Sequence, residues 1–428
     1  MTDTATHSTG EKARIGAPSI SGFTEEGENL SPLNEAEVAA SPLGGDAAKA
    51  HSHGGGAGIP DSSRAGRKTS YNVEDFPALT GREEDFRFTP LKRMGGLHKN
   101  ALAGVAPELT VAGANVSTLE TVAMTDARVG SAGIPEDRIS ANAWKHAAEA
   151  KVLTIPANSS GEQVTLTYTG TSTEAAASHL VVVAEANSES VVVIDHVGSA
   201  VLAQNIEIDV REGAKLTVIS LQAWADDAIH ASSHLAKVRK DGHLKHIAVT
   251  YGGDLVRLTP SAHFDGQGGE VELFGLYFAD AGQHLEHRLF VDHATENCKS
   301  NVLYKGALQG KDAHTVWVGD VLIRKEAKGT NSYEANRNLV LTEGARADSV
   351  PNLEIETGLI DGAGHASTTG RFDDEHLFYL MSRGIDEKTA RRLVVRGFLN
   401  EIVQQIRVPE IEERLAETIE RELAATDS

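Results

Sequence analysis

The feature that most constrains the fold is a long-range repeat between residues 151 and 360. Valine, isoleucine, threonine and leucine form short runs there, and a turn of small residues precedes each run. Successive turn markers are 25, 29 and 27 residues apart; they are Ser188, Gly213, Gly242 and Gly269. A fixed period in the twenties with strand-type content is typical of a solenoid of stacked β coils. At about 27 residues per coil, this stretch predicts roughly eight coils.

A β-sandwich is the alternative architecture for a chain so rich in strand formers. It would place strands about every 8–12 residues, with turns rich in glycine and proline and with no longer period. The longer spacing favours the solenoid, so we predict a mainly β protein with a parallel β-helix core over residues 151–360. An end coil of such a stack exposes a strand edge that must be capped or paired.

The two stretches before the core differ from it in composition. Residues 1–67 are rich in Ser, Gly, Ala, Thr and Glu and nearly free of aromatics, which predicts a disordered, low-complexity tail. Its His51 and His53 form an H-x-H pair, for which we favour a solvated polar tract over a metal site. Residues 68–150 are interpreted as an N-terminal helical region, with a helix expected over 137–150.

Residues 361–428 predict a C-terminal helical domain. Asp386 follows a glycine stop at Gly384 and is placed to cap a helix. One face of that helix is expected to consist of Ala390, Leu393, Val394, Gly397 and Phe398. The last helix carries a narrow apolar stripe at a spacing of four, made of Ile411, Leu415, Ile419 and Leu423. We expect this stripe either to pack back on its neighbour or to bind a partner's groove.

Charge and cysteine content exclude several classes of function. The net charge of −21 argues against nucleic acid or an anionic membrane as a partner, because phosphate contacts need clustered lysine and arginine. No apolar run approaches the roughly 20 residues that span a bilayer. The N-terminus lacks the apolar segment of a secretory signal. The single cysteine, Cys298, excludes an internal disulfide and a four-cysteine cluster site, so we expect a cytoplasmic protein.

The densest group of candidate metal ligands lies between residues 284 and 298. It contains His284, Glu286, His287, Asp292, His293 and Cys298. On a strand, His284 and His287 face opposite sides, whereas His287 and His293 share one. We therefore favour a structural role in the coils over a metal site. No P-loop, G-x-S-x-G or H-E-x-x-H motif is present in the sequence.

A second candidate is His365, which we place in a glycine-rich loop where the β region meets the helices. It belongs to three segments with fixed spacing, Pro351–Ile355, His365–Gly370 and Asp373–Ile385. Together they resemble the C-terminal signature of the SufB/SufD family of iron–sulfur cluster assembly proteins. Ala366 follows the histidine where SufB members usually have glutamate, so the chain looks more like the SufD branch. Many SufD members carry cysteine where this chain has Ala363, so no role of that thiol transfers.

The resemblance implies a right-handed parallel β-helix between two helical regions. It also implies a scaffold subunit that is not itself an enzyme and that pairs with a SufB-type paralogue and a SufC-type ATPase. The iron–sulfur cluster would be transient, shared with the partner at the interface and not held by this chain alone. His365 would be its candidate iron ligand there, since imidazole is a competent ligand for iron.

Two other functions remain open from the residues. A SufB-type paralogue would use a solenoid cysteine, for which Cys298 is the one candidate. A β-helix enzyme acting on polysaccharides would need paired carboxylates on one face, for which Asp292 and Asp320 are candidates.

Overall fold

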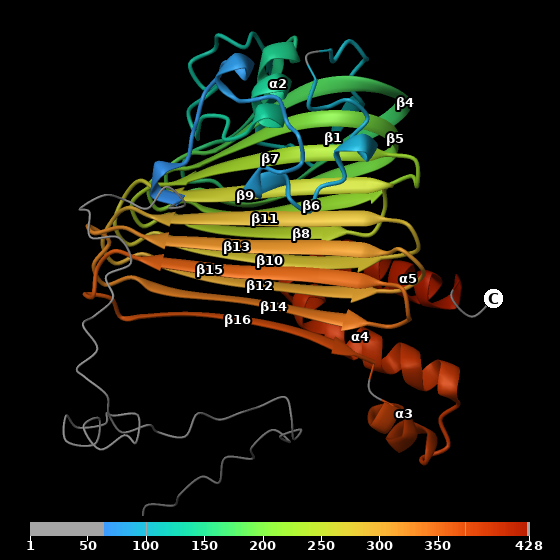
Figure 1. Ribbon diagram of the computed structural model, residues 1–428. Helices are drawn as coiled ribbons and strands as arrows, with labels where there is room; N and C mark the ends of the chain where they lie inside the picture. Colours follow the sequence, from blue (N-terminus) through green and yellow to red (C-terminus); the bar gives the residue numbers. More distant parts are fainter. Residues whose placement is uncertain (1–63, 100, 373, 426–428) are drawn as a thin grey trace, which may run out of the picture. The chain divides into compact units, whose positions relative to one another are not determined.

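The computed structural model describes residues 64–99, 101–372 and 374–425. The predicted tail up to residue 63, with His51 and His53, lies outside the described residues. In the described part, sixteen strands join in one sheet with the order β15-β13-β11-β9-β7-β5-β6-β8-β10-β12-β14-β16 along its main path. Figure 1 shows these strands stacked from β4 down to β16. The predicted parallel β-solenoid is thereby confirmed.

The strands of the solenoid lie on two faces, and β5 (Glu189–Val210) joins them. Its first half pairs with β6 and its second half with β7, both in parallel. One face continues through β6 (Lys215–Trp224), β8 (His243–Thr250), β10 (Glu270–Ala279), β12 (Lys299–Leu308), β14 (Asn331–Val340) and β16 (Gly362–Arg371). The other continues through β7 (Ile229–Val238), β9 (Leu255–Phe264), β11 (His284–His293), β13 (His314–Ile323) and β15 (Arg346–Ile355). The first coils use β3 (Ala150–Ile155) and the long β4 (Ser160–Ala184).

The register of the parallel pairs sets the length of each coil. The first residues of the even-numbered strands are partners in turn: Lys215, His243, Glu270, Lys299, Asn331 and Gly362. Subtracting successive numbers gives coils of 28, 27, 29, 32 and 31 residues. The period predicted from the turn markers is confirmed, and the last two coils are slightly longer.

One corner of every coil needs a residue in the left-handed region of backbone space. The positions that stack at this corner are Asn158, Asn187, Gly213, Asp241, Gly268, Asn297 and Gly329, all with positive φ. Each N–H donates to a carbonyl of the next coil, as Asn187 does to Glu212 at 3.0 Å. Only glycine, asparagine and aspartate enter this region at low cost. A Cβ on Gly213 would also lie 2.5 Å from Asn187 Oδ1, so glycine at this corner leaves room for the asparagine of the neighbouring coil.

The interior of the solenoid is apolar at most positions but contains buried imidazoles. The interior residues of β8 include Leu244 and Ala248, and His246 lies between them on the same side of the strand. His287 stacks on Tyr277, with ring centroids 5.0 Å apart, and His293 contacts Ser300 at 2.8 Å. Burial lowers the pKa of His246 to about 4, of His287 to about 3 and of His293 to about 4.

The two longer C-terminal helices, α4 (Glu387–Ile406) and α5 (Pro409–Ala425), cover the face made by β6, β8, β10 and β12. The short α3 (Asp374–Met381) precedes them, and Asp386 caps α4 by accepting from Thr389 N at 3.0 Å. The stripe predicted on the last helix is confirmed, because Leu415, Ile419 and Leu423 are buried in a cluster with strand residues of that face. The stripe therefore packs back on this molecule.

The face predicted for α4 is correct at Ala390, which is buried, and at Phe398, which packs against the core, but wrong at Leu393. Its buried residues are Ala390, Val395, Leu399, Ile402 and Ile406, whereas Leu393 is 46% exposed. The strands, not the helix's own pattern, select the buried side. Lys305 of β12 donates to the Phe398 carbonyl at 2.9 Å and pairs with Glu401 at 2.5 Å, which fixes the rotation of the helix.

The stretch before the core is less helical than the sequence predicts. It contains α2 (Arg138–His146), the strands β1 (Glu108–Ala112) and β2 (Thr118–Val122), and the short 3-10 helices η1 (Arg64–Gly66), η2 (Val73–Asp75), η3 (Glu84–Phe86) and η4 (Leu91–Arg93). Buried polar contacts fix it to β9 and β11: Thr89 donates to Glu286 at 2.8 Å, and Arg257 pairs with Asp137 at 3.0 Å. Arg67, which the sequence places in the tail, pairs with Glu136 at 3.0 Å.

The interior imidazoles should make the fold sensitive to acid. Their folded-state pKa values lie below the unfolded value of about 6.5. Between these two values the unfolded chain binds protons at the histidines and the folded chain does not. The free energy of unfolding should therefore fall as pH drops below about 6.5, by about 1.4 kcal/mol per pH unit for each such histidine. Urea midpoints at pH 7, 6 and 5 measure this, and His287→Gln should reduce the slope. An unchanged midpoint between pH 7 and pH 5 would contradict it.

Candidate functional site

His365 lies on the last strand of the solenoid, not in a loop. It belongs to β16 and is the register partner of Glu334 on β14. The loop assignment from the sequence is wrong because all ten residues of β16 pair with β14, glycines included. Backbone pairing to a preformed strand overrides the weak strand propensity of Gly362 and Gly364. Along the sheet β16 has a hydrogen-bonded strand on one side only, so its outer edge is unpaired among the described residues.

Glu334 is the buried group behind this histidine. Its side chain is 1% exposed, its Oε1 is 3.9 Å from His365 Nδ1, and neither carboxyl oxygen has a hydrogen-bond partner of ordinary geometry. Burial, and secondarily the nearby charge of Asp320, raises the pKa of Glu334 to about 8, against a smaller opposing effect of the Asn352 backbone amide. A carboxyl group that keeps its proton near neutral pH, beside a half-exposed imidazole, is a typical functional arrangement.

The opposite face of the solenoid makes room for Glu334. A Cβ on Gly319 of β13 would lie 2.3 Å from Glu334 Oε2 and 2.4 Å from the Trp317 ring. The missing side chain therefore lets Glu334 cross the interior toward the facing sheet. The Trp317 indole N–H is also buried without a partner. Unpaired polar atoms from both faces thus gather at this end of the solenoid.

A chain of hydrogen bonds joins the interior to the exposed strand next to His365. Asn336 donates to the Tyr277 hydroxyl at 2.9 Å and accepts from Ser349 at 2.7 Å. Ser367, two residues after His365, donates to Ser349 at 2.8 Å. The interior at the last coils is therefore rich in polar side chains.

His365 and Glu334 together offer one nitrogen and one oxygen ligand. Imidazole and carboxylate suit divalent iron, and both also suit zinc and manganese. In the stretches described, no three His, Cys, Asp or Glu residues converge as a complete metal site. A metal ion or cluster at His365 would therefore take its remaining ligands from another molecule.

The sequence reasoning missed Glu334. Its neighbours Ser332, Asn336 and Asn338 share its spacing of two, which puts a polar row on one side of β14. That row faces the interior only because β14 pairs in register with β12, where Val302 opposite Glu334 is a core residue. The alternation was visible in the sequence, but the register that turns it inward was not.

The other histidine-rich candidate does not form one site. His284 contacts Glu286 and His314, each at 3.1 Å, on the outer side of β11. His287 and His293 lie in the interior, where His287 contacts Thr250 at 3.0 Å. Cys298 is buried, and burial raises the pKa of its thiol. This placement disfavours a reactive cysteine in the solenoid.

The two carboxylates considered for polysaccharide chemistry are held by other groups. Arg324 donates to both oxygens of Asp292 at 2.6 and 2.9 Å, and His263 lies 2.9 Å from the same carboxylate. Asn352 donates to Asp320 at 2.7 Å. Asp292 is ion-paired, Asp320 is hydrogen-bonded and both are buried, so the two groups do not form the open acid and base pair that glycoside cleavage needs.

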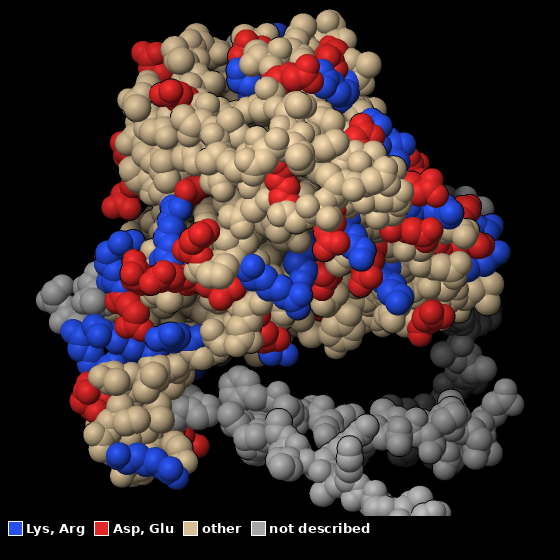
Figure 2. All heavy atoms as spheres, turned by 180° about the vertical axis from the view of Figure 1, so that it is seen from behind, with Lys and Arg blue, Asp and Glu red and all other residues tan. Residues whose placement is uncertain are grey.

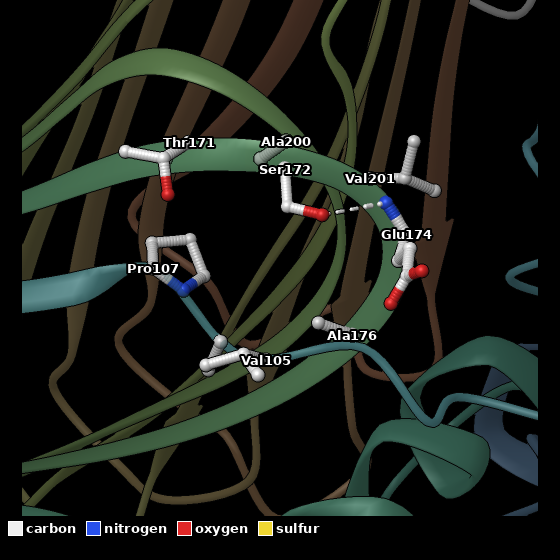
Figure 3. A pocket seen from close by; sticks show the side chains of 10 residues that line it. Val105, Pro107, Thr171, Ser172, Glu174, Ala176, Ala200 and Val201 are labelled. Atoms are coloured by element: carbon white, nitrogen blue, oxygen red, sulfur yellow. Dashed lines mark hydrogen bonds between the residues drawn. The ribbon is translucent and has the colours of Figure 1, made fainter.

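Two cavities outside this site carry no evident chemistry. Figure 3 shows a small one of about 50 Å³ beside a bulge of β4, where the Glu174 N–H donates to Ser172 Oγ at 3.2 Å. A larger one of about 330 Å³ lies at the start of α4; Gln309, Thr342, Lys388 and Arg391 contribute to its lining. Acidic and basic side chains are interspersed over the face seen in Figure 2. None of the described helices is long and apolar enough to cross a membrane.

Comparison with known proteins points to one family. A model described as "SUF system FeS cluster assembly, SufBD core domain" matches residues 166–398. An iron–sulfur cluster assembly SufBD family protein of Mycobacterium bovis is 54% identical over 368 residues, covering 84% of this chain and 93% of the relative. One of Mycobacterium leprae is 52% identical over 368 residues, covering 84% and 94%. A second M. leprae protein of that description is 28% identical over 201 residues, covering 47% and 23%.

Replacing Glu334 should stabilise the fold. Between its unfolded pKa of about 4.5 and its folded pKa of about 8, the folded chain retains a proton that the unfolded chain releases, so stability falls as pH rises. Glu334→Gln is neutral at every pH and should raise the free energy of unfolding by about 1–3 kcal/mol at pH 8, and little at pH 4. Thermal midpoints across this range measure the difference.

Glu272 on β10 provides the matched control. Its hydrogen bond to His243 helps hold the pKa of Glu272 below its usual value, so its charged form stabilises the fold above the unfolded pKa. Glu272→Gln should therefore lower the thermal midpoint at pH 8. If Glu334→Gln also lowered the thermal midpoint at pH 8, Glu334 would have to be ionised and paired in the folded protein.

Proposed function

The chain belongs to the SufBD family of iron–sulfur cluster assembly proteins, and we propose that it is the non-catalytic scaffold subunit of a cluster assembly complex. The nascent cluster, as cargo, would form on a surface shared with a second subunit. The observation that carries this proposal is His365, an iron-competent side chain on β16, one of the two end strands of the main sheet path, whose outer edge is unpaired among the described residues.

The ligand inventory supports a shared site. Iron–sulfur clusters are usually held by four thiolates. This chain has one thiol, that of Cys298, which is buried in the interior away from the end strands. Whatever cluster forms at His365 must take most of its ligands from a partner. The chain would contribute position, one or two ligands and a polar surrounding.

We assign the partner at this edge to a SufB-type paralogue. Strand edges with free N–H and C=O groups pair readily with another chain. Around the edge lie exposed apolar side chains that a partner would cover, namely Tyr333, Ile355 and Leu359. M. leprae has two SufBD family proteins with unequal similarity to this chain, in keeping with a pair of paralogues.

A SufC-type ATPase would bind at α3. This short helix exposes Phe378 at 74%, Tyr379 at 54% and Met381 at 42%, an unusual concentration of apolar surface. In Figure 1 α3 projects from the end of the solenoid, beyond β16. The chain has no P-loop motif, so nucleotide hydrolysis would be the partner's. The α5 stripe is unsuited to this role because it is already buried.

Loss of His365 should abolish cluster supply without loss of the fold. His365→Ala removes a half-exposed side chain, and surface changes usually cost no more than about 0.5 kcal/mol. We expect soluble, assembled complex in cells but no activity of iron–sulfur enzymes that depend on it. His243→Ala, which removes a half-exposed strand histidine beside Glu272, is the matched control and should leave supply intact. Normal supply with His365→Ala would refute the assignment.

Charges on α3 should prevent ATPase binding. Phe378→Asp with Tyr379→Asp places two carboxylates where an apolar contact is proposed, and both side chains are exposed, so the β-rich circular dichroism should persist. Pull-down of the ATPase should fall at least tenfold while the paralogue is retained. Val105→Asp, at another exposed apolar residue, is the control. Undiminished ATPase capture by the double variant would move the docking surface elsewhere.

A further inference from the structure

Glu334 is an exception among the buried carboxylates of this chain. Glu207 accepts from the backbone N–H of Gly130 at 2.7 Å and Ala132 at 3.0 Å, and lies 2.7 Å from His179. Glu286 is equally buried and lies among Arg257, His284 and Thr89. Of these three, Glu334 alone has two carboxyl oxygens without a hydrogen-bond partner of ordinary geometry, apart from the nearby Asn352 backbone amide. Buried polar groups nearly always have hydrogen-bond partners, so this exception indicates a bound species, such as a metal ion, that the chain itself does not supply.

The surroundings of Glu334 define where such a bound species would lie. Its Oε1 faces His365 Nδ1 at 3.9 Å, which is too long for a hydrogen bond. Oxygen and nitrogen ligands about 2.1 Å from one metal ion lie about 3.0–3.4 Å apart, so a small rotation of either side chain closes the difference. Toward the interior, the Gly319 backbone and the Trp317 ring bound the space. Toward the solvent, half-exposed His365 leaves it accessible.

We propose that Glu334 and His365 together bind one divalent iron ion, with Glu334 as a ligand that sequence motifs do not indicate. This deepens the proposed function and rests on it for the identity of the metal. The pair supplies one oxygen and one nitrogen, a donor set that suits Fe(II) better than Cu(I). The remaining coordination positions face the unpaired edge of β16 and hold water until a partner's ligands replace it. The chain would thus carry iron to the shared site before any thiolate binds it.

The experiment uses the purified full chain under anaerobic conditions, with Fe(II) as the probe in equilibrium dialysis. We expect one bound iron per chain at micromolar concentration. Glu334→Gln and His365→Ala should each weaken binding at least tenfold. His243→Ala and Glu272→Gln, the same pair of changes on β8 and β10, should leave it unchanged. Co(II) as a second probe should show visible absorption bands whose intensity changes in Glu334→Gln.

The outcomes separate this inference from the proposed function. No iron bound by the wild-type chain up to millimolar Fe(II) overturns the inference, as does full binding by Glu334→Gln. In either case a loss of cluster supply in His365→Ala cells would leave the scaffold role in place. The converse result is iron binding that requires both residues, together with normal cluster supply in cells that carry His365→Ala. That result would keep the metal site and reject the scaffold assignment. The thermal midpoint of Glu334→Gln, measured on the same preparation, distinguishes lost binding from unfolding.

Discussion

In-register pairing of each coil's backbone with the next is the interaction on which the structure depends. Residues at equivalent positions of successive coils pair with one another from β6 to β16. This pairing requires a residue in the left-handed region of backbone space at the same corner of each coil. Once that register is set, successive side chains of each strand alternate between the interior and the outside, so residues two apart lie on the same side. The meeting of Glu334 and His365, one coil apart, is a product of this register and of no local signal.

The register also explains how the interior changes along the stack. At one interior position the early coils carry the aliphatic side chains Val192 and Val218, whereas β14 places Glu334 at the equivalent position. A solenoid tolerates this because each coil contacts only its neighbours, so unfavourable polar burial at one end is not transmitted to the rest. The aliphatic coils supply stability, and the terminal coils can hold groups that a folded core would otherwise exclude.

The sequence predicted the parts of the structure that depend on local pattern. The coil period, the Asp386 cap and the stripe on α5 were visible because each is set by residues close in the chain or by a regular repeat. Part of the buried side of α4 and the strand conformation at His365 were predicted wrongly, because contacts with distant strands decide both. Local propensity is a weak guide wherever a preformed sheet offers a template. Of the candidate site, the motif singled out His365, but its buried neighbour required the register.

The position of the pair on the terminal coil has a consequence for the order of events in assembly. In a linear stack the end coil has one neighbour to hold it, so it frays first and exchanges its amide hydrogens fastest. β16 belongs to that end coil, and only the edge that faces the stack is paired, with β14. A second subunit that adds a strand there would supply the missing neighbour and suppress the fraying. Docking and the setting of the ligand geometry would then be a single cooperative event, so that an unpartnered chain holds its cargo loosely and a paired one holds it in place.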